Sequence, residues 1–261
     1  MRIEMLAIIK KDIRGITFNR RMMVSLLVVP IVLTVFLPTV FIMIMYLMPD
    51  EMGDLQKLLE LLPINQQNEN MNEAVSRLLL NYLLPVFFLI IPIMAASVMA
   101  AGSFVGEKEK HTLETLLYSP LSLKQIFRAK VFAAFLLSML VSFLSFFVML
   151  AVLETEIFLT SGSLIMPQIQ WLLIMLLVSP AVSLIAVTLI VRVSAKAQSM
   201  EDAQQGAVFL ILPILLMLAG QFTGVMLISP LILFGIGAVC ALLAAVLLRQ
   251  CMRRFSYEML L

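Results

Sequence analysis

The sequence predicts an all-α integral membrane protein with six transmembrane helices, a helix before the first of them and a helical insert between the second and third. Hydrophobic residues make up 62% of its 261 residues and charged residues only 13%. An ordinary soluble domain is about 45–50% apolar and about 25% charged. Five long windows hold no charged residue, and most Lys and Arg residues fall on one side of the resulting topology.

Each uncharged window is long enough for a span, since a helix crosses about 30 Å of hydrocarbon in roughly 20 residues. The windows are 22–49, 78–106, 131–153, 157–191 and 203–248. As a helix the last would reach about 69 Å, so we expect it to fold back at Ser229 and Pro230, where proline removes a donor. The expected spans, in one transmembrane domain covering 1–261, are about 22–48, 78–105, 131–153, 171–191, 207–228 and 231–248.

The basic residues orient these spans. Sixteen of the eighteen Lys and Arg residues precede the first span, follow the sixth, or lie in the second-to-third and fourth-to-fifth connections. Only Lys57 and Arg77 lie in the alternate connections. The positive-inside rule assigns the richer side to the cytoplasm. We therefore expect both termini, including the tail 249–261, to be cytoplasmic.

Residues 1–21 predict a helix lying in the membrane interface before the first span. Their apolar residues recur at helical spacing with Lys10, Lys11 and Arg14 between them. These apolar residues are Ile3, Leu6, Ile9, Ile13 and Ile16. The alternative is a basic segment that only fixes topology.

The external connection 50–77 is the one sizeable segment on the opposite side. Its acids lack the order of a calcium loop, so we interpret them as solvated rather than metal-binding. They are Asp50, Glu51, Asp54, Glu60, Glu69 and Glu73. The apolar residues between 52 and 62 favour a short amphipathic helix on the outer leaflet.

The sequence lacks the residues that several classes of function need. The sequence has no phosphate-binding loop, no His/Cys cluster, and a single histidine, His111, outside the spans. No ionisable residue is expected at mid-membrane depth, where proton- and sodium-coupled carriers usually place one. If this protein moves a solute uphill, the energy must come from a partner. The rival class, a membrane enzyme, would have only Glu107, Glu109 and His111 to use.

The insert 106–130 has its own helical signals. Thr112 can cap a helix beginning at Leu113, and the Glu114 carboxylate in its first turn interacts favourably with the positive end of the helix dipole. Leu113, Leu116 and Leu117 share one face of that helix. Ser119 and Pro120 end it, and Ser122 with Gln125 forms a capping box for a second helix that runs through Lys130 into the third span. The leucine face suits either a protein partner or lipid headgroups.

The string GEKEKHTLETLLYSPLSLKQIFRAK, from Gly106 to Lys130, resembles the signature loop of type-2 ABC transporter permeases, in their sodium-efflux and drug-export branch. The stretch VSAKAQSMEDAQQGA, from Val193 to Ala207, is similar to the segment before the fifth span in that branch. The opening KKDIRGITFNRRMMVSLLVVP resembles its N-terminal elbow. The branch commonly has glycine where His111 stands.

The resemblance implies a permease subunit in the cell membrane, an exporter driven by a separate cytoplasmic ATPase. ATP and Mg would bind that ATPase; the chain itself would hold no cofactor or metal and bind no nucleic acid. Six spans would be half of a transporter, so a second copy or a related permease is implied. The docking residues would be Glu107, Glu109, Thr112, Leu113, Glu114, Leu116 and Leu117, with Pro120 and Ser122 fixing their angle. The alternative is a membrane anchor or sensor that binds an ATPase without transporting solute.

Overall fold

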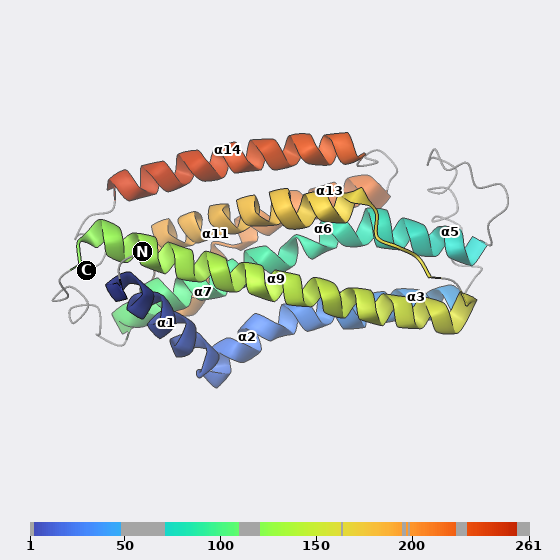
Figure 1. The fold of residues 1–261 in the computed structure, drawn as a ribbon, viewed down its shortest axis with the longest axis horizontal. Coiled ribbons are helices and arrows are strands. Elements are labelled where there is room, and N and C mark those ends of the chain that lie inside the picture. The colour runs from blue at the N-terminus through green and yellow to red at the C-terminus, as the bar shows by residue number, and fades with distance from the viewer. Residues whose placement is uncertain are drawn as a thin grey trace.

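The computed structural model describes residues 3–47, 71–109, 121–162, 164–194, 197, 199–222 and 229–254. These residues form a bundle of long helices that run side by side, without a strand among them (Figure 1). Six helical segments within the described ranges are long and apolar enough to cross a membrane, which confirms the predicted all-α membrane protein with six spans. They are Arg20–Met45, Ala74–Glu109, Leu123–Thr160, Ile169–Ser194, Met200–Phe222 and Pro230–Arg253.

Several of these segments are composites of shorter elements. The first comprises α2 (Arg20–Ile31), η1 (Val32–Phe36) and α3 (Leu37–Leu47), and the second comprises α5 (Met71–Leu78), η3 (Leu79–Leu83), α6 (Leu84–Phe88) and α7 (Ile90–Glu109). The third is α9 (Leu123–Ser161), and the fourth comprises α10 (Ile169–Leu173), η4 (Ile174–Val178) and α11 (Ser179–Ser194). The fifth comprises α12 (Met200–Gln205) and α13 (Val208–Phe222), and the sixth is α14 (Pro230–Arg254). A separate helix, α1 (Ile3–Thr17), precedes them. As expected, the last uncharged window is divided before Pro230, where α14 begins.

Proline explains where the three π-helical turns of the described residues occur. Each of η1, η3 and η4 ends two residues before a proline: Pro38, Pro85 and Pro180. A proline ring inside a helix clashes with the carbonyl four residues before it and offers no N–H to bond. A widened turn at that place moves the carbonyl away while the helix continues.

The second and fourth spans form the centre of the bundle. In their most apolar windows 83% and 72% of the residues are buried, against 22%, 28% and 17% for the first, fifth and sixth spans. α7 packs against both α9 and α11, and α14 covers α11 and η4. The first, fifth and sixth spans therefore carry the apolar surface that lipid or a second subunit must cover.

Several helix ends gather at one end of the bundle. The start of α1 and the C-terminal end of α14 lie at one end, together with the end of α7 and the start of α9 (Figure 1). We call this the terminal end and the opposite one the distal end. The apolar stripe of α1 packs partly on protein: Ile9 and Ile16 are buried, whereas Leu6 is exposed. Its position at a membrane interface stays a prediction.

Candidate functional site

The helix before the insert extends further into it than the sequence suggested, and the helix after it begins where the predicted cap places it. α7 continues to Glu109, and α9 begins at Leu123. The capping box predicted at Ser122 is present, with its backbone N–H donating to Gln125 Oε1 over 3.0 Å. The remaining docking residues lie outside the described part of the chain: Thr112, Leu113, Glu114, Leu116, Leu117 and Pro120.

A buried lysine joins these two helices at the terminal end. Lys130, on α9, is only 1% exposed. Its Nζ lies 2.8 Å from Glu107 Oε2 and 3.7 Å from Asp12 Oδ2. It also donates to the carbonyl and, over 3.2 Å, to the hydroxyl of Ser103. α7 and α9 are therefore connected by a charge pair that lies almost wholly inside the protein.

Two further hydrogen bonds connect this charge pair to α1. Lys11 Nζ donates to Glu107 Oε1 over 2.6 Å, and Ser103 Oγ donates to Asp12 Oδ2 over 2.6 Å. We call these five residues, Lys11, Asp12, Ser103, Glu107 and Lys130, the terminal network. Two lysines balance two carboxylates, which buried charges require.

Burial dominates the electrostatics of Asp12. Loss of hydration raises the pKa of its carboxyl above the ordinary value, although Lys130 and the Ser103 hydrogen bond act in the opposite direction. The aspartate is therefore held in place at some free-energy cost. Such a cost at a helix junction is typical of a group that fixes one arrangement of its neighbours.

The segment before the fifth span is attached to the same end. Glu109 Oε1 accepts a hydrogen bond from the backbone N–H of Met200 over 2.8 Å. Arg21, on α2, and Glu201, on α12, form an exposed ion pair of 2.6 Å. Gly106 allows the close approach, because a Cβ there would lie 3.2 Å from Met200 Sδ.

Two predicted docking residues thus have partners within the chain. Glu107 is 6% exposed, and Glu109 is bonded to α12. Sequence reasoning missed Lys11, Asp12, Ser103 and Lys130. One signal was available: Asp12 interrupts the buried side of α1 between Ile9 and Ile16, where a carboxylate needs a partner.

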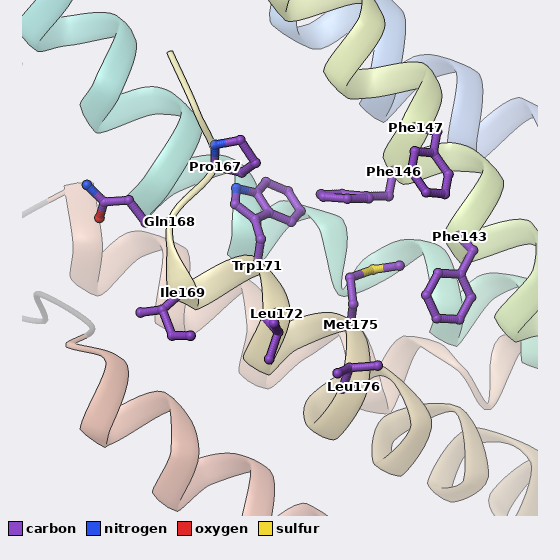
Figure 2. Close-up of a pocket in the computed structure, with 10 residues that line it drawn as sticks. All are labelled: Phe143, Phe146, Phe147, Pro167, Gln168, Ile169, Trp171, Leu172, Met175 and Leu176. Carbon is purple, nitrogen blue, oxygen red and sulfur yellow. The ribbon is translucent and has the colours of Figure 1, made fainter.

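An aromatic pocket lies nearer the distal end, between α9 and the α10–η4 segment (Figure 2). Its volume is about 480 Å³, within the range of small-molecule sites. Its lining is almost entirely apolar: Phe143, Phe146, Phe147, Pro167, Gln168, Ile169, Trp171, Leu172, Met175 and Leu176. Trp171 packs edge-on against Phe88 with ring centroids 5.4 Å apart, and its ring lies 5.1 Å from that of Phe146.

A backbone irregularity fixes the tryptophan. In η3, Leu84 N–H bonds to Leu79 O, so the Leu80 carbonyl loses its α-helical donor. The next donor along a π-helical turn would be residue 85, which is proline and has none. Trp171 Nε1 donates to this Leu80 carbonyl over 2.9 Å. The indole therefore satisfies a buried acceptor that would otherwise be unpaired, and this hydrogen bond orients the ring in the pocket wall.

No group of three or more His, Cys, Asp or Glu residues gathers at metal-binding distance in the ranges that the structure describes.

Comparison with known proteins assigns the family. The sequence model of the family described as "ABC-2 family transporter protein" matches residues 6–249, nearly the whole chain. No curated protein and no solved structure matches it. Members of this family are membrane components of ABC transporters, which generally work with a cytoplasmic ATPase and are not the ATPase themselves. With six apolar helices and this match, the chain belongs to the ABC-2 family and is a multi-pass transmembrane component of an ABC transporter.

Proposed function

We propose that this protein is the permease subunit of an ATP-driven exporter, and that a separate cytoplasmic ATPase docks on the connection 110–121. The family match supports the transporter class. The basic residues concentrated at the terminal end support a cytoplasmic position for that end. ATP and Mg would bind the ATPase.

The observation that carries the coupling proposal is the terminal network. Glu107, three residues before the connection, pairs with Lys130, nine residues after it, and both are bound to α1. Breaking a buried ion pair costs about 3–5 kcal/mol. A force applied to the connection would therefore move α7, α9 and α1 together rather than bend the connection alone.

This arrangement divides the roles of the predicted docking residues. Leu113, Leu116 and Leu117 would fill an apolar groove on the ATPase, with Glu114 and the Thr112 cap orienting their helix. Pro120 and Ser122 would fix the angle at which that helix meets α9. Glu107 and Glu109, which are bonded within the chain, would position the connection instead of contacting the ATPase directly.

The transporter would be assembled from two permease subunits, either two copies of this chain or one copy and a related chain. The open first, fifth and sixth spans provide the surface for such a contact. With both termini cytoplasmic, the connection 50–77 would face the outside of the cell membrane.

The experiment is to coexpress the protein with its ATPase and to compare Leu116→Asp/Leu117→Asp with the wild type. We expect unchanged membrane insertion, loss of ATPase copurification and loss of ATP-driven solute movement. Leu164→Asp, at an exposed leucine in the α9–α10 connection, is the control and should change none of these. Normal copurification and transport by the double variant would contradict the docking proposal.

The alternative function, an ATPase-binding anchor or sensor, makes a different prediction. ATPase binding and stimulation would then depend on Leu116 and Leu117, but reconstituted vesicles would show no ATP-driven solute movement. Vanadate-sensitive movement would exclude the alternative.

A further inference from the structure

A basic cleft lies between the third and sixth spans at the terminal end. It has a volume of about 200 Å³ and is lined by Lys124 and Arg128 of α9 and by Arg249, Met252 and Arg253 of α14. The four basic side chains are all exposed. Figure 1 shows the start of α9 beside the C-terminal end of α14, so two helices far apart in sequence bring these charges together.

This arrangement is electrostatically unfavourable on its own. Lys124 and Arg128 are four residues apart on one helix, as are Arg249 and Arg253 on the other, and like charges at this spacing repel. Lys124 also lies in the first turn of α9, where the helix dipole disfavours a cation. The C-terminal position of Arg249 and Arg253 on α14 is favourable for their own helix, but it does not reduce the repulsion across the cleft.

No counter-charge is present within the described part of the chain. Lys11, Arg21 and Lys130 form ion pairs there, whereas none is seen for a cation of the cleft. The terminal network shows the contrast, because there each lysine faces a carboxylate. Among the residues that the structure describes, four cations thus share one cleft with no acid in its lining, which is the arrangement of an anion-binding site.

The position of the cleft relative to the membrane specifies the anion. The uncharged windows 131–153 and 203–248 adjoin it, so the cations lie where two apolar spans leave the hydrocarbon. Phosphate groups of lipids occupy this depth, and basic pockets between spans bind anionic headgroups. Arginine guanidinium groups can bind phosphate oxygens in pairs. We propose that the basic cleft binds the headgroup of an anionic phospholipid.

A lipid headgroup fits better than the two other anions available. Five residues line the cleft, whereas each partner contributes about 20–30 residues to a stable protein interface. A soluble phosphate ion would lack the acyl chains that the adjoining apolar spans can contact. The proposal does not depend on ATPase docking, so it can fail while the proposed function holds, and the reverse.

The test measures the thermal stability of the full chain in neutral micelles during titration with phosphatidylglycerol, phosphatidylcholine or inorganic phosphate. We expect saturable stabilisation by phosphatidylglycerol alone, weakening as ionic strength rises. Arg249→Gln/Arg253→Gln should weaken it about 30-fold, because each interfacial cation contributes about fivefold to binding of an anionic lipid. Lys124→Gln/Arg128→Gln, on the opposite wall, should have a similar effect and serves if the first variant does not fold.

The matched control is Arg14→Gln/Arg20→Gln, which removes the same charge from exposed positions near the terminal end but outside the cleft. It should leave phosphatidylglycerol binding within about threefold of the wild type. An equal loss in this control would show diffuse surface attraction and overturn the proposal. Equal stabilisation by phosphatidylcholine, or by inorganic phosphate at the same concentration, would also overturn it.

Discussion

Replacing Lys130 by methionine tests the terminal network most directly. The substitution keeps an unbranched apolar side chain, one heavy atom shorter, but removes the charge and the donors. In the wild type this ammonium group contacts Glu107, Asp12 and both oxygens of Ser103. The variant therefore leaves two carboxylates facing each other in a buried position.

The expected loss is about 3 kcal/mol, at the lower end of the range of about 3–5 kcal/mol for breaking a buried ion pair. Two features of the structure reduce it. Lys11 stays 2.6 Å from Glu107, although its side chain is 53% exposed and its charge is screened. Asp12 keeps the hydrogen bond from Ser103 and, with its raised pKa, can bind a proton when its cation is lost.

The assay is denaturant unfolding in micelles, followed by the fluorescence of Trp171, the one tryptophan of the chain. Glu107→Gln and the double variant complete a thermodynamic cycle. The double variant should be less destabilised than the sum of the single ones by about 1 kcal/mol or more, because each single variant already loses the Glu107–Lys130 contact. Lys10→Met, at an exposed lysine of α1, should change stability by less than about 0.5 kcal/mol.

The reasoning would be refuted if Lys130→Met behaved like the control, or if the two single losses simply added. The first result would mean that the buried contacts of Lys130 contribute no more than surface ones, and the second that Lys130 and Glu107 are not energetically coupled. Loss of ATPase coupling without loss of stability would instead place the function of Lys130 in a moving state rather than in the resting fold.

Three further perturbations follow from particular contacts. Because folding raises the pKa of Asp12, the folded protein binds a proton more tightly than the unfolded chain, so stability falls as pH rises from about 3.8 through the folded pKa. Asp12→Asn should remove this part of the pH dependence of unfolding. An unchanged pH profile of unfolding would contradict the burial of Asp12 as its cause. Gly237→Ala should destabilise the contact of α14 with η4, because a Cβ there would lie 2.6 Å from a Leu177 carbon. The control Gly235→Ala meets no atom within 4 Å and should be neutral or stabilising by up to about 1 kcal/mol. Equal melting temperatures for the two variants would count against this packing. Trp171→Phe should lower stability by about 2 kcal/mol in a thermal melt, because a buried carbonyl loses its donor; a change below about 0.5 kcal/mol would show that water replaces the indole.

Features that depend on short stretches of sequence were predicted well. The capping box at Ser122 and Gln125 is local chemistry, and it starts α9 as expected. The division of the last uncharged window before Pro230 follows from length and from a missing donor. The pairing of α7 with α9 at their charged ends was not predicted, because Glu107 was interpreted as an exposed docking residue. Nothing in the string GEKE distinguishes a carboxylate that faces water from one that faces a lysine 23 residues later.

The sequence by itself determined the membrane class, the six spans and the side on which the cations gather. It did so because lipid demands uncharged segments of a minimum length, a requirement that each segment meets alone. Tertiary structure alone decided which charges are neutralised and which are not. Lys130 reaches Glu107 and Asp12, while the four cations of the basic cleft are brought together with no acid among the described residues that line it. The physical reason is that a charge takes its pKa and its partners from groups within a few ångströms, and packing rather than chain order decides which groups those are.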